Sequence, residues 1–247
     1  MIAIKALVKT IGPQEILRGI DMEIRRGETM VIVGRSGGGK SVLLKHIIGL
    51  MKPTAGDVLV EGESVIGLNE RQLVKIRKKV GILFQSGALF DSMTVEENLA
   101  FPLKESGEKD PEVIRERIGE ALDVVALSGT EKKMPESLSG GMKKRVGLAR
   151  AIISRPEYIL YDEPTTGLDP IASDAINHLI RRLQKRFSVT SIVVTHDMKS
   201  AFHVGDQIAY LNEGRIYFQG TPDEFRASRD PLIQDFIEGR SPEATDD

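Results

Sequence analysis

One glycine-rich segment carries the residue types that bind phosphate. Residues 34–41 read Gly-Arg-Ser-Gly-Gly-Gly-Lys-Ser and match the pattern G-x-x-x-x-G-K-[ST]. Backbone N–H groups of such a loop converge on phosphate oxygens because glycines leave the approach open, and a following helix N-terminus adds positive potential. We expect Lys40 to reach the terminal phosphates and the Ser41 hydroxyl to ligate Mg²⁺. The candidate nucleotide-binding residues are Gly34, Arg35, Ser36, Gly37, Gly38, Gly39, Lys40, Ser41 and Val42.

Two adjacent carboxylates end an apolar segment much later in the chain. Tyr158-Ile-Leu-Tyr runs directly into Asp162 and Glu163. Successive side chains of a strand point in opposite directions, so the two carboxylates have different roles. We expect Asp162 to bind Mg²⁺ through water and Glu163 to orient or deprotonate an attacking water. Alone, such a pair usually solvates a strand end, but beside a phosphate-binding loop it indicates nucleotide hydrolysis.

Other polar residues gain meaning only together with these two motifs. Ser139 and the glycines after it precede the helical run KKRVGLARAII, where in isolation they would serve as a helix cap. His196 ends the apolar run SIVVT, and with Asp197 beside it would also suit a cap. The remaining histidines have no partners at metal-ligand spacing and are interpreted as structural; they are His46, His178 and His203.

The apolar patterns predict the elements that must position these groups. Continuous apolar runs at residues 29–33 and 80–84 predict strands buried on both faces. A strand at 57–60 and a basic helix near 69–79 lie between them. Alternating apolar residues near the N-terminus predict antiparallel strands with one solvated face; they are Ile2, Ile4, Ala6, Val8, Ile20, Met22 and Ile24.

From about residue 86 to residue 154, helix signals replace strand signals. Thr94 with Glu97 forms a capping-box pattern, and Asp110-Pro111 offers an N-cap followed by proline at the first helical position. This stretch is predicted to be a helical insertion. Strands return at 158–161, 191–195 and 207–211, so their alternation with helices predicts a parallel α/β sheet. One of those helices has an apolar face made of Ile176, Leu179, Ile180, Leu183 and Phe187.

The overall composition excludes several classes of function. The chain has no Cys, which rules out disulfides, thiolate zinc sites, iron–sulfur clusters and cysteine nucleophiles. A net charge of −2 gives no global positive field to attract nucleic acid, and no apolar stretch approaches the ~20 residues of a membrane helix. The N-terminal sequence lacks the features of a secretory signal, so we expect a cytoplasmic protein.

The combination and order of these motifs resembles the ATP-binding cassette (ABC) family from about Met1 to Phe225. The family signature is typically Leu-Ser-Gly-Gly-Gln, and Leu138–Met142 matches it except at the last position. Gln85 ends a predicted strand as the family's Q-loop glutamine does, Asp169 stands where its D-loop lies, and His196 corresponds to its switch histidine. The resemblance implies an α/β fold of the P-loop NTPase (RecA-like) type, with a parallel-sheet core, an N-terminal antiparallel β subdomain and an inserted α-helical subdomain.

The resemblance also implies a division of the chain and roles for its residues. Residues 1–227 would form the ATPase domain, with 1–85 and 155–227 as its core, 86–154 as its helical signature subdomain, and 228–247 as a short C-terminal helix and polar tail. The implied catalytic residues are Glu163, His196 and Gln85, with the imidazole on the γ-phosphate. The implied Mg²⁺ ligands are Ser41, Gln85 and Asp162. The residues that would complete the ATP site of a second copy, in a head-to-tail homodimer, are Ser139, Gly140, Gly141, Met142 and Asp169.

Two positions depart from the family pattern. Many relatives stack adenine on an aromatic residue shortly after the first strand, where this chain has Ile11. Met142 replaces the usual glutamine of the signature, which removes a polar side chain but leaves the Ser139 hydroxyl and the Gly141 amide to touch phosphate. Hydrolysis is still expected, whereas the discrimination of ATP from GTP is left open.

Two kinds of cassette fit these motifs, a transporter subunit and a soluble cassette ATPase of DNA maintenance or translation. The segment between Lys40 and Ser139 holds no heptad run for a long coiled coil, and the chain has one set of motifs, which favours the transporter. The string LFQSGALF, with LSGGM and the segment after Asp230, resembles the Mla-type ATPases that serve phospholipid transporters with mammalian-cell-entry (MCE) proteins. An importer of another small solute is the alternative. The resemblance implies a peripheral protein at the cytoplasmic face of the inner membrane, bound to an integral-membrane permease.

Two surfaces are candidates for partners. Ala88, Leu89, Phe90 and Met93 follow Gln85 where relatives receive their permease, although core packing of the helical insertion would explain them equally well. The C-terminal residues Leu232, Ile233, Phe236 and Ile237 have helical spacing, which suits either a helix packed on its own domain or a docking surface for a small regulatory subunit. The tail SPEATDD is predicted to be disordered, and no nucleic-acid partner is expected.

Overall fold

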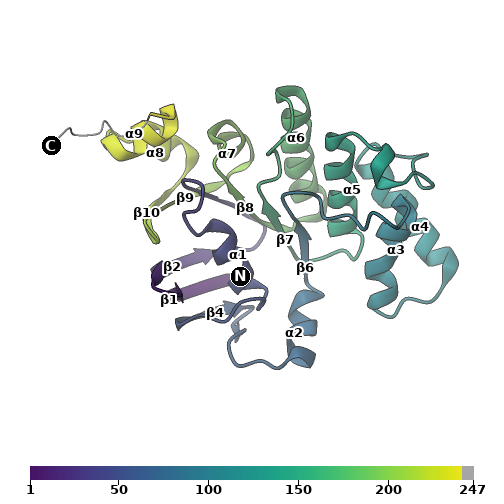
Figure 1. The fold of residues 1–247 in the computed structure, drawn as a ribbon, viewed down its shortest axis with the longest axis horizontal. Helices are drawn as coiled ribbons and strands as arrows, with labels where there is room; N and C mark the ends of the chain where they lie inside the picture. Colours follow the sequence, from purple (N-terminus) through teal and green to yellow (C-terminus); the bar gives the residue numbers. More distant parts are fainter. Residues whose placement is uncertain (241–247) are drawn as a thin grey trace.

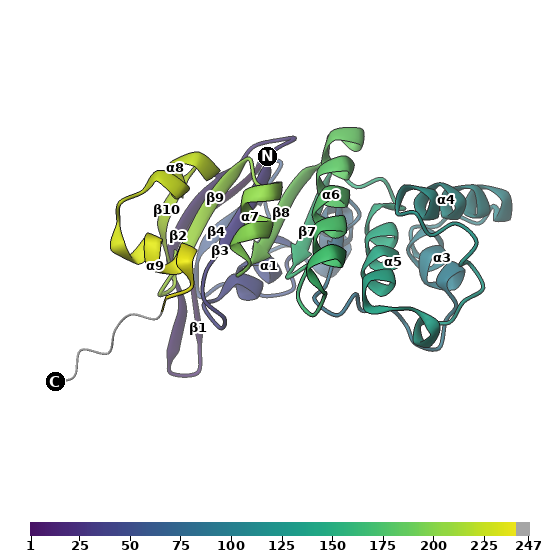
Figure 2. The same cartoon turned by 90° about the horizontal axis from the view of Figure 1, so that it is seen from above.

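The computed structural model of the chain describes residues 1–240, and the predicted disorder of the tail 241–247 concerns residues outside that range. Two sheets and a separate group of helices make up the fold (Figures 1 and 2). The first sheet is antiparallel, in the order β2-β1-β4-β5, as the alternating N-terminal pattern predicts. Its strands are β1 (Ile2–Ile11), β2 (Gln14–Ile24), β4 (Ala55–Val60) and β5 (Glu63–Ser64).

The second sheet has six strands in the order β10-β9-β3-β8-β7-β6. Five of them are parallel, which confirms the predicted parallel core, and β10 is antiparallel at one edge. The strands are β3 (Thr29–Val33), β6 (Val80–Leu83), β7 (Tyr158–Asp162), β8 (Thr190–Thr195), β9 (Gln207–Asn212) and β10 (Arg215–Gly220).

The central strands of this sheet are buried on both faces and separate two hydrophobic cores. Met30 and Ile32 of β3 face the N-terminal sheet and α1 (Lys40–Ile47), whereas Val31 and Val33 face the helices on the other side. Every residue of β3 is buried, as its continuous apolar run predicts. The other helices of these two layers are α2 (Glu70–Arg77), α6 (Pro170–Phe187) and α7 (Met198–Val204).

Two expectations about burial are wrong, and both errors occur at the ends or edges of elements. The run that contains β6 is not buried on both faces, because β6 is an edge strand: Val80 and Ile82 are half-buried and Phe84 is 38% exposed. Phe187 is 40% exposed rather than part of the apolar face of α6, because it is the last residue of that helix.

The helical insertion forms one end of the molecule (Figure 2). It contains α3 (Val95–Glu105), α4 (Pro111–Val124) and α5 (Gly140–Ile152), all within the range 86–154, with a short 3-10 turn at Pro135–Ser137. Both predicted caps are present: Thr94 and Glu97 bond reciprocally, and the Asp110 carboxylate accepts from the Glu112 N–H. Helix α5 packs on β6 and joins the insertion to the sheet.

The C-terminal segment packs on its own domain. Helices α8 (Pro222–Ala227) and α9 (Pro231–Glu238) cover the end of the sheet formed by β9 and β10 (Figure 2). Ile233 is buried, and the Phe236 ring stacks on Tyr210 with 4.7 Å between ring centroids. The apolar residues at helical spacing therefore contribute to the core. Within residues 1–240, no helix combines the length and the apolar character needed to cross a bilayer.

The contact of β6 with α5 leaves no space for a side chain at Gly81, where a Cβ would lie 2.1 Å from the Ala151 carbonyl oxygen. We expect Gly81→Ala to lower the free energy of unfolding by about 3 kcal/mol, the upper part of the usual range for overpacking. Gly119→Ala is the matched control, because its Cβ would meet nothing within 4 Å on the exposed side of α4; it should stabilise by about 0.5–1 kcal/mol. Urea denaturation of both variants measures the difference, and equal stabilities would contradict the packing at Gly81.

Candidate nucleotide-binding site

The phosphate-binding segment lies where the chain turns from β3 into α1. Gly34 passes so close to β9 that a Cβ would lie 2.4 Å from the Leu211 carbonyl oxygen. Gly39 precedes α1 with a left-handed φ of 95° and gives the helix no side-chain cap. The first N–H groups of α1 are therefore available to an anion, and the glycines at both positions are required by the backbone path.

The Lys40 side chain is buried inside this loop. Its ammonium donates to the carbonyl oxygens of Gly34 at 2.9 Å and Arg35 at 3.1 Å, and it lies 3.6 Å from Glu163 Oε1. A buried ammonium needs such partners, so the loop holds a fixed positive charge at its centre. The predicted loop residues on the solvent side are Arg35, Ser36 and Gly37, and those partly covered are Gly38 and Val42.

The first carboxylate of the β7 motif meets the hydroxyl that follows Lys40. Ser41 Oγ donates to Asp162 Oδ1 at 2.9 Å, although the two residues lie far apart in the sequence. The sheet order explains the meeting, because β3 and β7 flank β8 and end at the same edge. Two oxygen ligands of the kind that Mg²⁺ prefers are thus adjacent, as the sequence predicts.

The second carboxylate, Glu163, is buried and held from several sides. Its Oε2 atom lies 2.9 Å from His196 Nδ1 and accepts from Thr166 Oγ1 at 3.2 Å. Its backbone has a left-handed φ of 49°, which is unusual for a residue with a side chain and typical of functional sites. Because a carboxylate accepts hydrogen bonds, His196 Nδ1 carries the proton in this contact and Nε2 is left to face a ligand.

Other predicted site residues do not meet this cluster within the single chain. The Gln85 side chain is exposed, and among residues 1–240 it has no hydrogen-bonding partner. Asp169 accepts from the Ile171 and Ala172 N–H groups, both at 2.9 Å, and so caps α6. Both views separate α5 from α1 by β7 and α6 (Figures 1 and 2).

The signature segment therefore lies at the start of α5, away from the phosphate loop. Ser139 Oγ accepts from the Met142 N–H at 3.3 Å, and Ser139 and Gly140 are exposed. Gly141 is half-buried, and Met142 packs against the core, which explains how an apolar residue is tolerated in that position. Within one chain this segment is a helix cap, and its predicted role concerns a second copy.

One residue of the site, Lys144, was not predicted from the sequence. It is buried, and its ammonium donates to the Gln85 carbonyl and, at 3.1 Å, to the Glu163 carbonyl. Burial lowers the pKa of Lys144, while the charges of Glu163 and Asp162 oppose that shift. A signal was present in the sequence, because Lys144 shares the i, i+4, i+7 face of α5 with Leu148 and Ala151, which are buried.

A hollow lies beside the phosphate loop, and Ile11, the residue at the position where many relatives stack adenine, is not part of it. Ile11 ends β1 and is 47% exposed. The hollow next to the loop, with a volume of about 450 Å³, is instead lined by Ile16 and Arg18 together with Gly37 and Gly38. The hollow therefore carries charges of both signs beside an apolar group, because Glu15 and Glu213 also line it, and Ile11 does not.

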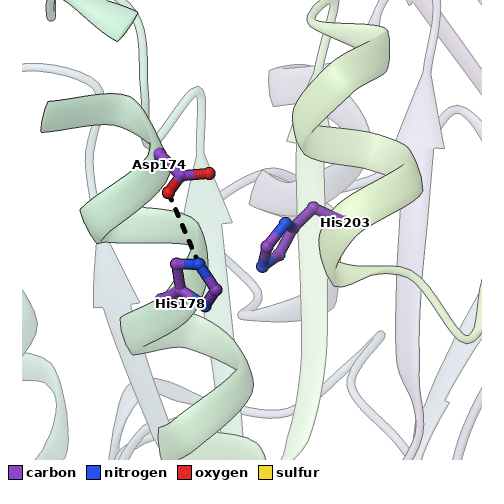
Figure 3. Close-up of side chains that lie close together, drawn as sticks. All are labelled: Asp174, His178 and His203. Atoms are coloured by element: carbon purple, nitrogen blue, oxygen red, sulfur yellow. Dashed lines mark ion pairs between the residues drawn. The ribbon is translucent and has the colours of Figure 1, made fainter. Parts of the chain in front are cut away.

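The expectation that the other histidines have no partners at metal-ligand spacing is wrong for His178 and His203. His46 is buried, its Nδ1 lies 2.7 Å from the Val42 carbonyl oxygen, and burial lowers its pKa. His178 and His203 do have partners: with Asp174 they form a cluster whose candidate ligand atoms all lie within 4.8 Å of one another (Figure 3). The sequence distance between α6 and α7 concealed this cluster, although Asp174 and His178 have i, i+4 spacing.

Comparisons with a family model, with related sequences and with solved structures all identify the ATP-binding cassette family. The family model described as "ABC transporter" matches residues 17–166. The chain is 40% identical to the probable ribonucleotide transport ATP-binding protein mkl of Mycobacterium leprae, over 97% of this chain and 69% of that protein. It is 37% identical to the intermembrane phospholipid transport system ATP-binding protein MlaF of Haemophilus influenzae, over 98% of this chain and 91% of that protein.

A solved structure extends the agreement to the fold. The dimeric post-hydrolysis structure of the ATP-binding cassette MJ0796, bound to ADP and Pi, superposes with a TM-score of 0.83 at 34% identity, and covers 90% of this chain and 99% of that one. The predicted P-loop NTPase fold is confirmed. With the loop, the carboxylates and His196 in the arrangement described above, the chain belongs to the ABC transporter family as an ATP-binding cassette ATPase.

Proposed function

We propose that this chain binds ATP with Mg²⁺, closes as a head-to-tail homodimer, and uses hydrolysis to drive phospholipid transport through a membrane permease. The observation that carries the hydrolytic part is the convergence of Lys40, Glu163 and His196 at the edge of one sheet. The phosphate-binding groups come from β3 and α1, and the groups for the attacking water come from β7 and β8. These are the parts that phosphoryl transfer to water requires.

The residues at the proposed metal position fit Mg²⁺. The contact of Ser41 Oγ with Asp162 Oδ1 places a hydroxyl beside a carboxylate, both hard oxygen ligands. Ser41 and Asp162, and Gln85 by family resemblance, would hold the ion. A bound Mg²⁺ would supply positive charge to offset the negative charge that develops on the phosphate oxygens.

The side chains and backbone of this chain would bind the phosphates, hold the attacking water and accept its proton. Lys40 and the first N–H groups of α1 bind and orient the phosphates. The Glu163 carboxylate holds the attacking water and accepts its proton. His196 donates from Nδ1–H to that carboxylate, and the Nε2 side of its ring is left for contact with the γ-phosphate, so the imidazole connects the base to the substrate.

A second copy would complete the site. The phosphate loop covers only one side of a nucleotide, and a second helix start adds positive potential where negative charge increases during the reaction. Ser139 at the exposed start of α5 is such a group, and in both views β7 and α6 separate α5 from α1, the helix that follows the loop (Figures 1 and 2). Two-fold pairing gives two equivalent sites, and the related cassette MJ0796 is a dimer in its solved structures.

A groove beside the Q-loop is the proposed permease contact. It has a volume of about 870 Å³, and Phe84, Phe90 and Phe101 line it with side chains 38%, 42% and 38% exposed. The Phe90 and Phe101 rings lie 5.0 Å apart, and the Arg150 guanidinium lies 5.9 Å from the Phe90 centroid. Of the apolar residues predicted here, Ala88 and Phe90 line the groove, whereas Leu89 packs on the core.

The phospholipid assignment rests on relatives rather than on a cargo site. MlaF is described as serving intermembrane phospholipid transport, and the chain covers most of its length. The name of mkl, which specifies ribonucleotide transport, makes a small solute the second candidate. The chain would then be a peripheral subunit at the cytoplasmic face of the inner membrane. Its partners would be a permease, an MCE-type lipid-binding protein and a small regulatory subunit.

Replacing the proposed base tests the hydrolytic assignment. Glu163→Gln should lower kcat for ATP at least ~100-fold, because the amide accepts no proton, while ATP binding persists and dimer accumulates. Steady-state ATPase assays and light scattering with ATP measure these effects. Glu120→Gln, which removes an exposed carboxylate paired with Arg155, is the control and should behave as the native protein. Native turnover by Glu163→Gln would contradict the role of Glu163.

Lys144 is proposed to position the base, because it holds the main chain at Glu163. Lys144→Met keeps the aliphatic volume but leaves two carbonyl oxygens without their buried donor. Displacement of Glu163 should lower kcat about tenfold or more, with KM changed less than about threefold. Lys143→Met on the same helix is the control. Equal kcat for the two variants would show that Lys144 does not position the base.

Reconstitution tests the transport assignment. The copurifying permease and this chain, placed in liposomes, should transfer labelled phospholipid to a carrier protein or acceptor membrane only when ATP is hydrolysed. Phe90→Asp should lower permease copurification at least tenfold, because it places a charge in an apolar contact, whereas the similarly exposed Phe187→Asp should not. ATPase activity stimulated by a small solute and indifferent to lipid would exclude the phospholipid assignment.

A further inference from the structure

A cluster of metal-ligand side chains lies outside the nucleotide site, between α6 and α7. Asp174 and His178 are one turn apart on α6, and His203 faces them from α7 (Figure 3). His178 Nε2 lies 3.4 Å from Asp174 Oδ2, and the two imidazole rings meet edge to face with 4.5 Å between centroids. None of the contacts that hold Glu163 and His196 involves these residues.

The cluster continues an interface that is already fixed by hydrogen bonds. Asn177 Nδ2 donates to Ser200 Oγ at 2.9 Å, and Ser200 Oγ donates to Asp197 Oδ2 at 2.6 Å. His178 follows Asn177 directly, and His203 is one turn beyond Ser200. The buried Asn177–Ser200 bond joins the two helices, and the Ser200–Asp197 bond lies at the start of α7. The three ligand side chains therefore project from joined helices rather than from loops.

The residue types and spacing suit a divalent transition-metal ion. Two imidazole nitrogens and one carboxylate oxygen form a ligand set that binds Zn²⁺ and its neighbours well, whereas Mg²⁺ and Ca²⁺ prefer oxygen alone. Ligand atoms about 2.0–2.1 Å from a tetrahedral ion lie about 3.4 Å from each other. The Asp174–His178 pair already has that separation, and rotation of the half-buried His203 ring brings the third atom from within 4.8 Å.

We infer that Asp174, His178 and His203 form a binding site for a zinc-type divalent ion, with water as the fourth ligand. The side chains are accessible, since His178 is 62% and Asp174 45% exposed, so the ion enters without unfolding. A bound ion fastens α6 to α7. Helix α6 begins at the cap Asp169 and α7 begins just after His196, so the fastened pair links a residue expected to face the partner copy with a residue of the nucleotide site.

Titration of the nucleotide-free, chelator-treated protein with ZnCl₂ and CoCl₂ tests the inference. One ion per chain should bind, with visible absorption of tetrahedral Co²⁺ that Zn²⁺ abolishes. His178→Ala, His203→Ala and Asp174→Asn should each weaken binding at least tenfold, because loss of even an outer-shell group costs 10–100-fold. At a hundredfold excess over the native Kd, Zn²⁺ should raise the Tm of the native protein by about 5–10 °C, and it should raise the Tm of each of these three variants by less.

His196→Gln serves as the matched control, because it removes the only histidine of the nucleotide site and leaves the cluster intact. It should keep the Co²⁺ spectrum. Circular dichroism checks that each variant is folded, which is expected for exposed or half-buried positions. Absence of binding, or binding that is lost in His196→Gln but kept in His203→Ala, would overturn the inference and leave the two rings as an ordinary aromatic pair.

Discussion

The site depends on a pair of buried opposite charges, Lys40 and Glu163. Their side chains are 6% and 10% exposed, with 3.6 Å between Nζ and Oε1. The free-energy cost of removing both charges from water exceeds their mutual attraction unless further polar groups form hydrogen bonds with them. Those groups are present: loop carbonyls accept from Lys40, while His196 and Thr166 bond Glu163. The glycine-rich loop is thus both a phosphate cradle and a shell for the ammonium.

The order of strands brings this pair together. Lys40 comes after β3 and Glu163 after β7, and β8 lies between the two strands and ends near His196. The Glu163 N–H donates to the Val194 carbonyl at 2.9 Å, which fixes the unusual backbone conformation at Glu163 from the neighbouring strand. Parallel strands with both faces buried give this edge the rigidity that a preorganised charge cluster needs.

Sequence patterns predicted the features that neighbouring residues determine, and they did not predict the features that depend on contacts between distant segments. The loop at 34–41, the capping boxes and the buried strand β3 are each determined within a few residues. Strand β10 was missed because its half-buried and exposed residues alternate without a clear apolar run, and β6 was assigned full burial because periodicity does not distinguish an edge from a centre. Lys144 and the pairing of His178 with His203 were missed because their partners come from distant segments.

Helix α5 connects regions that the motifs treat separately. Its cap, Ser139, is exposed on the surface that we propose binds a second copy. Further along the helix, Lys144 donates to the Gln85 and Glu163 carbonyls. Near its end, Arg150 donates to the Gly87 and Ala88 carbonyls at 3.0 and 2.8 Å, beside the aromatic groove. Because α5 contacts all three regions, a displacement of the signature in the proposed dimer would be transmitted to the main chain at Glu163 and to the groove. Coupling between hydrolysis and a bound permease then needs only a permease that binds the two positions of α5 with different free energies.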